Sequence, residues 1–305
     1  VPVDLLISPI GELVTAESKS GPVRGEYMRD VRRIRDAAIA ISGGQIVAVG
    51  KADELSQHIF TDSSTTLIDA TDRLVTPGLV DAHTHLIFDG NRADEFVMRS
   101  QGKTYTDIAA AGGGIVKSMR ATQSAGVERL VELGRRRIER MLESGTTALE
   151  IKTGYGLEVE SELCMLEAIY QLKAESVLDI VPTFMAAHAI PPGRDRERYV
   201  DDIVTDMLPR VVAMAKSQAE KSGVSAESMM PYIDVFCDRG YFTLDDTRKI
   251  FEASKRLGLK TRVHSDEFVN LGATTLAWNF VLFEPLRACS GTKNDRGRCR
   301  ACASF

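Results

Sequence analysis

The chain has 305 residues, of which 44% are hydrophobic and 27% are charged, with 38 basic against 43 acidic side chains. This balance is typical of a globular protein and excludes collagen, coiled coil, mucin stalk and intrinsic disorder. No window approaches the roughly 18 consecutive apolar residues of a membrane helix. A net charge of −5 gives no general attraction to nucleic acid or anionic lipid. We therefore expect a small-molecule substrate, with neither a nucleic-acid nor a membrane partner.

The cysteines and the first residues bear on the cellular compartment. Five cysteines are too few and too scattered for a disulfide scaffold, and the N-terminus lacks the basic, apolar and cleavage regions of a secretory signal. We therefore expect a reducing cytoplasm. The chain starts at Val1 rather than at methionine, from which we expect its natural start to lie upstream.

Short alternating apolar runs, separated by turn signals, make up the first part of the chain. They cover residues 4–10, 37–42, 45–50 and 66–75. The Gly43-Gly44 pair between two β-branched runs is a hairpin signal. We predict a small antiparallel sheet for this part.

From residue 74 onward, predicted strands alternate with stretches of helical period. The strands are predicted at residues 79–86, 147–151, 180–187, 233–236 and 260–264. The helices are predicted at residues 127–144, 160–174, 201–220 and 244–257. This alternation is typical of an α/β fold with a parallel sheet covered by helices. A complete (β/α)₈ barrel of roughly 250 residues would need three more units.

An open doubly wound sheet also fits this number of strands. Its diagnostic phosphate loop is missing, because the run from Ala111 to Gly114 has no lysine-threonine pair behind it and does not join a strand to a helix in the required way. We interpret that run as a tight turn near a ligand.

Residues 277–305 differ in character from the rest of the chain. Beyond Phe283 they have neither helical nor strand periodicity. Cys299 and Cys302, even with Cys289, lack the second pair that a four-ligand zinc knuckle needs. We therefore interpret this tail as a foreign or misread C-terminus.

Four of the five histidines lie at the ends of predicted strands: His83, His85, His188 and His264. Side chains at the C-terminal ends of barrel strands converge on one mouth, and residues two apart in a strand face the same way. We expect His83 and His85 to point inward together and to share one ion, since neutral imidazole is a preferred ligand of zinc and suits iron. The alternative is a histidine pair satisfied within the core. His58 is expected to be exposed.

The residues around the first two histidines, TPGLVDAHTHL at 76–86, resemble the first barrel strand of the amidohydrolase superfamily. Later strings narrow the resemblance to the imidazolonepropionases within that superfamily. They are IFDGNRADEF at 87–96, AGGGI at 111–115, EIKTGYGL at 150–157, MAAHAIPP at 185–192, VFCD at 235–238 and VHSDEF at 263–268. Together they cover the chain from about residue 4 to 276.

The resemblance implies an amidohydrolase-type (β/α) barrel, of which about five of eight units are present, with a small N-terminal β-sandwich. The expected division is a sandwich part at 1–75, a partial barrel at 76–276 and a tail outside the family at 277–305. The later strands, which in the family carry a further histidine and a metal-binding aspartate, are missing after Leu276. We therefore expect weak, chelator-labile metal binding and little turnover from these 305 residues.

The resemblance also assigns roles to individual residues. It makes His83, His85 and His264 ligands of one zinc or iron ion, and Glu267 the acid/base carboxylate, with His188 as a second catalytic residue. The substrate contacts that it implies are Arg92, Tyr105, Tyr155, His188 and Glu267. Taken singly, each has a plainer interpretation: a surface ion pair for the arginine, packing for the tyrosines, and for Glu267 a carboxylate favoured by a helix dipole.

The implied reaction is hydrolysis of the cyclic amide of 4-imidazolone-5-propanoate to N-formimino-L-glutamate in histidine degradation. The alternatives are another cyclic amidohydrolase or a ring deaminase of the same superfamily, because the His-x-His strand is shared across it. A third alternative is a fragment without catalytic activity. A homodimer is left open as the assembly.

Overall fold

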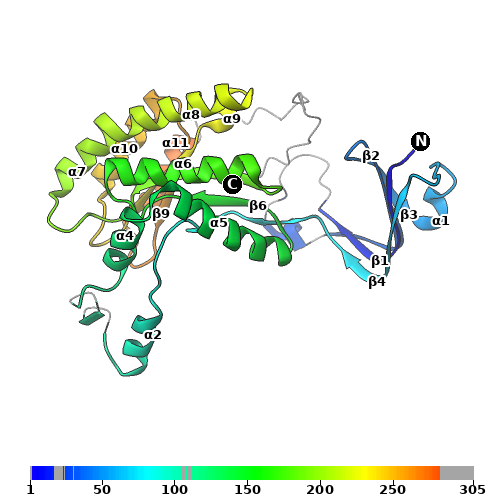
Figure 1. The fold of residues 1–305 in the computed structure, drawn as a ribbon, viewed down its shortest axis with the longest axis horizontal. Helices are drawn as coiled ribbons and strands as arrows, with labels where there is room; N and C mark the ends of the chain where they lie inside the picture. Colours follow the sequence, from blue (N-terminus) through cyan, green and yellow to red (C-terminus); the bar gives the residue numbers. More distant parts are fainter. Residues whose placement is uncertain are drawn as a thin grey trace. The chain divides into compact units, whose positions relative to one another are not determined.

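The computed structural model describes residues 2–16, 23, 25–29, 31–104, 107–108 and 111–281 (Figure 1). Tyr105 and the tail beyond residue 281, with its three cysteines, lie outside the described residues. The chain forms two compact units, Val1–Pro77 and Gly78–Phe283, and each is considered by itself.

The N-terminal unit contains one four-stranded sheet in the order β3-β2-β1-β4. Its elements are β1 (Leu5–Thr15), the short 3₁₀ helix η1 (Gly25–Arg29), β2 (Arg32–Ser42), β3 (Gln45–Lys51), α1 (Ala52–Leu55) and β4 (Thr66–Val75). The predicted hairpin is confirmed, because Ser42 pairs with Gln45 across Gly43 and Gly44, which both have positive φ.

Two expectations for this unit differ from the structure. The sheet is not wholly antiparallel, because β1 and β4 run parallel. Strand β4 is reached through a connection that contains α1, and a connection of that length permits parallel pairing where a two-residue turn does not. The described residues form a single sheet, whereas the resemblance implied a sandwich. Apolar clusters nevertheless cover both faces, one around Ile10 and Ala37 and the other around Ala38 and Ala40.

The second unit is built on a parallel sheet of five strands in chain order, β5-β6-β7-β8-β9. The strands are β5 (Leu79–Asp81), β6 (Thr146–Lys152), β7 (Asp179–Ala187), β8 (Tyr232–Cys237) and β9 (Thr261–Ser265). All four neighbouring pairs are parallel. The prediction of an incomplete barrel with five strands is therefore confirmed.

Strand β5 is shorter than predicted and ends at Asp81 instead of residue 86. The Asp81 carboxylate accepts the backbone N–H of His83, 3.2 Å away, which forms a local turn at the end of the strand. Contact with β6 continues beyond this turn, because the Thr84 carbonyl accepts the Lys152 N–H and its hydroxyl donates to the Glu150 carbonyl. The turn therefore places His83 and His85 just beyond the strand.

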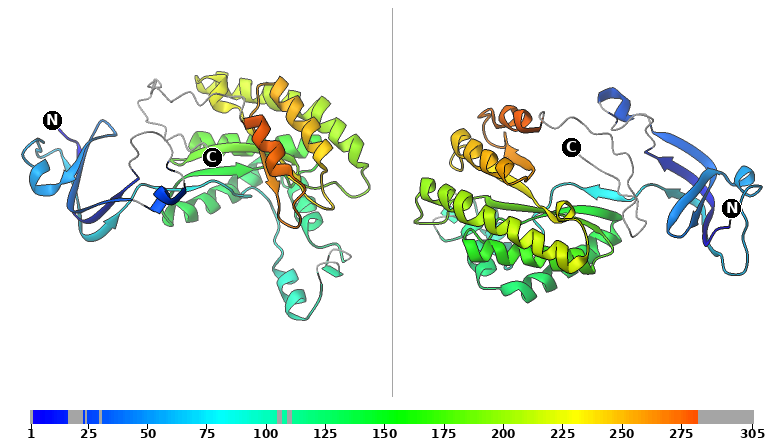
Figure 2. Two further views of the ribbon diagram at one scale, coloured as in Figure 1. Left: turned by 180° about the vertical axis from the view of Figure 1, so that it is seen from behind. Right: turned by 90° about the horizontal axis from the view of Figure 1, so that it is seen from above.

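Helices cover one face of this sheet (Figure 2). The helical elements of this unit are α2 (Ala93–Ser100), α4 (Ile115–Gln123), α5 (Gly126–Glu143), α6 (Val159–Glu175), α7 (Arg196–Asp202), the π-helical turn η2 (Ile203–Met207), α8 (Leu208–Ser222), α9 (Ala226–Met229), α10 (Leu244–Arg256) and α11 (Ala273–Val281). Helix α2 does not cover the sheet, because it projects away from it (Figure 1). The four predicted helices are confirmed, although the helix expected at 201–220 begins earlier and contains the π turn. Two apolar clusters join these helices to the strands, one around Leu130 and Ile151 and the other around Phe184 and Phe251.

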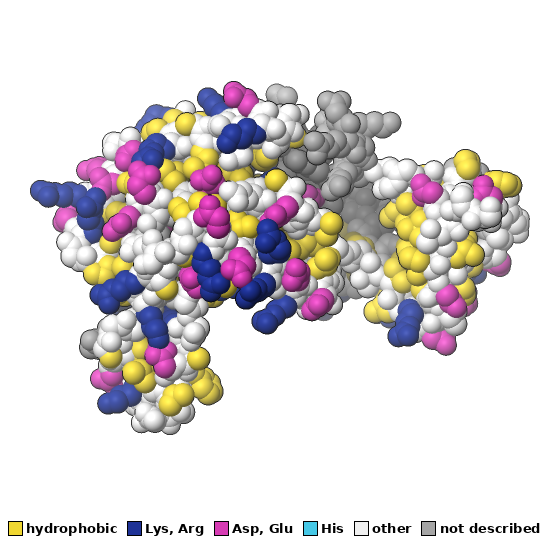
Figure 3. All heavy atoms as spheres, viewed as in Figure 1, with side chains coloured by type: hydrophobic (Ala, Val, Ile, Leu, Met, Phe, Trp, Pro, Cys, Tyr) yellow, Lys and Arg dark blue, Asp and Glu magenta, His cyan; other side chains and the backbone are white. Residues whose placement is uncertain are grey.

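The outer surface of these helices is polar, with basic and acidic side chains interspersed (Figure 3). Arg135 of α5 pairs with Glu175 of α6, and Arg210 of α8 pairs with Glu160 of α6. Each pair therefore joins two adjacent helices at the surface. Within the described residues, no helix combines the length and apolar character required to span a membrane.

Candidate metal centre and substrate site

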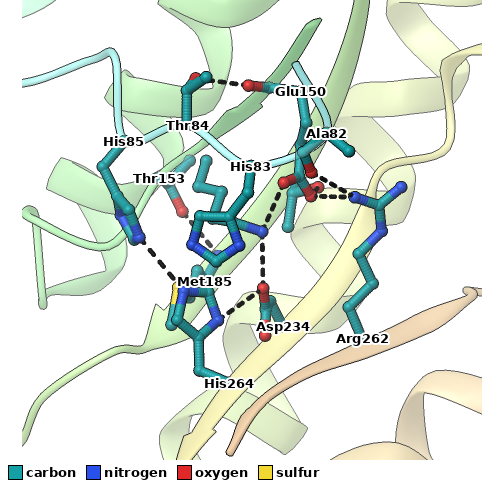
Figure 4. Close-up of polar contacts among 12 residues, drawn as sticks. Ala82, His83, Thr84, His85, Glu150, Thr153, Met185, Asp234, Arg262 and His264 are labelled. Carbon is teal, nitrogen blue, oxygen red and sulfur yellow. Dashed lines mark hydrogen bonds and ion pairs between the residues drawn. The ribbon is translucent and has the colours of Figure 1, made fainter. Parts of the chain in front are cut away.

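Three histidines meet at the C-terminal edge of the sheet (Figure 4). One possible ligand atom from each of His83, His85 and His264 lies within 4.8 Å of the other two. Nε2 of His85 is 3.2 Å from Nε2 of His264, and the rings of His83 and His264 have centroids 4.4 Å apart. The structure thus brings the first two histidines together, although His83 is exposed, and strand β9 supplies the third.

The protonation states of these rings suit a cation. Burial, with smaller contributions from neighbouring His188 and His264, lowers the pKa of His85 to about 2. Burial also lowers the pKa of His83, with a smaller effect from Lys152. Both rings are therefore neutral at neutral pH and keep a lone pair. Within the part of the chain that the structure describes, the buried Nδ1 of His85 has no hydrogen-bond partner. Three imidazole nitrogens are a donor set that zinc and iron accept.

A buried group of charges lies beside the three histidines. Nζ of Lys152 is 2.6 Å from Oε2 of Glu150 and 2.8 Å from Oδ2 of Asp234, and all three side chains are 2% exposed. Nη1 of Arg262 lies 2.5 Å from Oε1 of Glu150. Two cations thus balance two carboxylates. Nδ1 of His264 lies 2.9 Å from the same Asp234 oxygen that Lys152 contacts.

His188 follows β7 as predicted and stacks on His85, with ring centroids 4.7 Å apart and an interplanar angle of 20°. Its Nδ1 lies 2.8 Å from the carbonyl oxygen of Gly154. A carbonyl only accepts, so Nδ1 carries the proton and Nε2 of the neutral ring is an acceptor. Burial lowers the pKa of His188 to about 4, although the Gly154 carbonyl opposes the shift.

Tyr155 lies between the histidines and a cavity. Its ring centroid lies 6.0 Å from that of His85 and 5.3 Å from that of His188. Burial raises the pKa of its hydroxyl, and nearby Arg92 and Arg137 partly offset the rise. The cavity has a volume of about 310 Å³, and its lining includes Arg92, Arg137 and Tyr155. A cationic cavity therefore adjoins the imidazole cluster.

Arg137 forms part of the lining of this cavity. Its Nη1 donates to the carbonyl oxygens of Leu86 and Phe88, at 2.6 and 2.8 Å, and its guanidinium lies 3.9 Å from the centre of the Phe88 ring. A larger hollow of about 520 Å³ lies beside the β8–α10 loop, but none of the predicted site residues line it. We therefore place the candidate substrate site at the smaller cavity.

A buried carboxylate holds the loop that carries Tyr155. The Glu162 side chain, 0% exposed, accepts the backbone N–H groups of Gly154, Gly156 and Leu157, at 3.2, 2.7 and 2.9 Å from Oε1. At Gly154, φ is +110° and a Cβ would come within 3.0 Å of the His188 ring, so glycine is required there. These three hydrogen bonds hold the loop in which Gly154 lies against the His188 ring.

A second carboxylate holds the loop that carries Glu267. Asp238, at the end of β8 and 2% exposed, accepts the N–H groups of Glu267, Phe268 and Val269 at 3.0, 2.8 and 3.1 Å. Asp266 before them has φ +61°, a conformation that aspartate tolerates better than most residues. The loop is pinned through its backbone, while the Glu267 side chain is exposed.

The predicted site residues therefore divide into three groups. The structure brings His83, His85 and His264 together, with His188 and Tyr155 in ring contact and Arg92 on the adjoining cavity. It leaves Glu267 on the rim, where its carboxylate has no hydrogen bond within the described part of the chain. Tyr105 lies outside the described residues. Sequence reasoning missed a further set of charged residues: Glu150, Lys152, Glu162, Asp234, Asp238 and Arg262.

The fold resembles that of known deaminases. The chain matches E. coli guanine deaminase with a TM-score of 0.52 at 13% identity, over 91% of this chain and 55% of that one. It matches 5-methylcytosine deaminase from Klebsiella pneumoniae with a TM-score of 0.51 at 14% identity, over 86% and 51%. No protein-family model matches the chain. At this identity the matches concern the fold alone, which is the barrel scaffold of these deaminases.

Sequence similarity is more specific. The chain is 45% identical over 278 residues to the imidazolonepropionase of Symbiobacterium thermophilum and 43% identical over 277 residues to that of Alkaliphilus metalliredigens. The imidazolonepropionase of Chloroflexus aggregans is 43% identical over 279 residues. These matches cover 90% of this chain and 62–64% of the length of those relatives. Over nine-tenths of its length the chain is thus homologous to imidazolonepropionases, which confirms the resemblance seen in its motifs.

Proposed function

We propose that this chain carries the catalytic site of an imidazolonepropionase, which hydrolyses 4-imidazolone-5-propanoate to N-formimino-L-glutamate. The observation that carries the proposal is the coincidence of two results. Relatives named imidazolonepropionase share 43–45% identity over nine-tenths of the chain, and a cationic cavity adjoins three clustered imidazoles. The deaminases share 13–14% identity and support the fold alone.

The proposed cofactor is one divalent ion, zinc or iron, held by His83, His85 and His264. When bound, such an ion lowers the pKa of water and provides a nucleophile at neutral pH. The protein's own residues then have separate tasks. Arg92, at the cavity, would bind the propionate carboxylate through its planar, bidentate guanidinium, and the Tyr155 hydroxyl would donate to the same group.

Two further residues are proposed to orient the substrate ring and to transfer a proton. Neutral His188 presents an acceptor at Nε2 and would take a hydrogen bond from a ring N–H of the substrate, which orients the carbonyl carbon toward the attacking water. The Glu267 carboxylate would accept a proton from that water and return it to the ring nitrogen as the amide C–N bond breaks. Glu267 is exposed in the structure, so this role requires its side chain to turn inward when substrate binds.

The proposal also covers the cellular compartment and the partners of the chain. Cys164 and Cys237 are free thiols, which favours a reducing compartment such as the cytoplasm. We propose a small molecule as the substrate partner. A homodimer remains a proposal that native mass spectrometry of the purified chain would test.

The test compares substrates on the metal-loaded chain. The rate of imidazolonepropionate hydrolysis is compared with the rates for dihydroorotate, hydantoin and guanine. Because turnover is expected to be slow, the binding of imidazolonepropionate is also measured by calorimetry. We expect preference for imidazolonepropionate and at least tenfold weaker binding in Arg92→Gln. Arg140→Gln, on the exposed face of α5, is the matched control. Faster loss of another ring, or unchanged binding in Arg92→Gln, would overturn the proposal.

A further inference from the structure

The buried charges beside the histidines lie on one face of the sheet because of its strand register. Asp234 pairs with Arg262 and Phe236 pairs with His264 between β8 and β9. Side chains two apart in a strand share a face, so Asp234, Arg262 and His264 all point the same way. Glu150 and Lys152 share a face of β6 for the same reason. The inner face of the sheet therefore brings a carboxylate against a predicted metal ligand.

Asp234 occupies a particular place in that group. Its Oδ2 receives both Nζ of Lys152, at 2.8 Å, and Nδ1 of His264, at 2.9 Å (Figure 4). The contact between Nδ1 of His264 and Oδ2 of Asp234 is close, but it does not reach hydrogen-bond geometry. A carboxylate oxygen 2.9 Å away nevertheless favours a proton on Nδ1, because a bare lone pair there would repel the carboxylate.

We propose that Asp234 is a positioning residue of the metal centre. It fixes His264 as the Nδ1–H tautomer, so that the lone pair is on Nε2, the atom that lies 3.2 Å from Nε2 of His85. A carboxylate that accepts from the other ring nitrogen of a metal-binding histidine sets both the tautomer and the ring orientation. The inference rests on the metal centre of the proposed function. It adds Asp234, which is not one of the three predicted ligands, as a residue that positions one of them.

Lys152 and Glu150 hold Asp234 in place. Lys152 bridges the two carboxylates, while Glu150 is anchored by Arg262 and by the hydroxyl of Thr183, each at 2.5 Å. Asp234 is 2% exposed, and Lys152 contacts the same Oδ2 that faces His264. The network thus fixes the carboxylate before any ion binds.

The test measures zinc affinity by competition with a chromophoric chelator. We expect Asp234→Ala to weaken zinc binding by about 10–100-fold, and Asp234→Asn, which keeps an oxygen within reach of Nδ1, to weaken it less. In a His264→Ala background, Asp234→Ala should leave the affinity unchanged within about twofold, because its effect acts through His264. A merely structural role would lower the affinity in both backgrounds. Asp179→Ala, at the exposed start of β7, is the control.

A measurement on the unsubstituted chain covers the case in which Asp234→Ala does not fold. Long-range ¹H–¹⁵N correlation of the histidine rings in the metal-free protein, with His264 assigned by His264→Gln, should show the Nδ1–H tautomer. The Nε2–H tautomer, an equal loss of affinity in both backgrounds, or no zinc binding at all would overturn the inference. Zinc binding with this tautomer but without imidazolonepropionate hydrolysis would refute the proposed function alone.

Discussion

The base and the rim of the candidate site are built in different ways. At the base, side chains hold one another: Lys152 joins Glu150 and Asp234, and Asp234 contacts His264. At the rim, buried carboxylates hold backbone: Glu162 accepts three N–H groups of one loop, and Asp238 accepts three of another. The base therefore depends on the joint identity of several residues, whereas each loop depends on one carboxylate. Substitutions should separate metal binding from loop order.

The largest effect is expected at the base. Lys152→Met leaves Asp234 buried without its cation, and removing one partner of a buried pair typically costs about 3–5 kcal/mol of unfolding free energy. Urea denaturation of the metal-free chain measures this loss. Lys249→Met, at a pair with Asp201 in which both side chains are about half exposed, should change stability by less than about 1 kcal/mol. A loss at Lys152 no larger than at Lys249 would contradict the importance of the network.

An intermediate effect is expected at the first loop. Glu162→Gln keeps the shape of the side chain but removes the charge and turns an N–H donor toward the loop, at a cost of about 1–3 kcal/mol. Amide hydrogen exchange should become faster at residues 154–157, while zinc affinity stays within about threefold of the unsubstituted chain. Glu160→Gln, in the same helical turn but exposed, should leave exchange unchanged. A large loss of zinc affinity in Glu162→Gln would show that base and rim are not separate.

A smaller and more local effect is expected at the second loop. Asp238→Asn should speed amide exchange at residues 267–269, because an amide cannot accept from all the N–H groups that the two carboxylate oxygens now receive. The melting temperature and zinc affinity should barely change. Asp245→Asn, exposed in the first turn of α10, serves as the control. Unchanged protection at residues 267–269 would mean that Asp238 does not hold this loop.

The smallest effect at neutral pH is expected from His188→Gln. The pKa of His188 is lowered to about 4 from 6.5, so the unfolded chain takes up this proton at a higher pH than the folded chain. The contribution of His188 to stability is therefore complete above pH 6.5 and is lost as the pH falls from 6.5 toward 4. His188→Gln should flatten the dependence of unfolding free energy on pH in that window, as measured by urea denaturation at a series of pH values. A slope unchanged by His188→Gln would contradict the shift.

Much of the fold and part of the site were predictable from sequence. Alternation of strands and helices predicted the five-stranded parallel sheet, and the placement of His83, His85, His188 and His264 at strand ends predicted their convergence. The motif resemblance added Arg92 and Tyr155, which the structure places at one cavity. These predictions succeeded because side chains at the ends of parallel strands meet at one edge of the sheet.

The buried charges of the site could not be predicted, because they depend on how the strands pair, which the periodicity of the sequence does not reveal. In the sequence, Asp234 and Lys152 are isolated charges in short strands. Only the strand register, through Thr183 of β7, places them on a common face. The buried position of Glu162 was hidden because an acidic residue in the first turn of a helix is ordinary. Strand β5 ended early because the Asp81 carboxylate caps a turn, a local contact that competes with the ladder. A charged residue inside an apolar strand was the available signal.

Whether His83, His85 and His264 form one metal centre is tested most directly by anomalous diffraction at the zinc edge from crystals of the zinc-loaded chain. We expect one strong peak at about 2.0–2.1 Å from a nitrogen of each of the three rings, with Nε2 as the ligand atom of His264 and Nδ1 of His264 directed to Asp234. A peak held by other residues, or coordination through Nδ1 of His264, would contradict it.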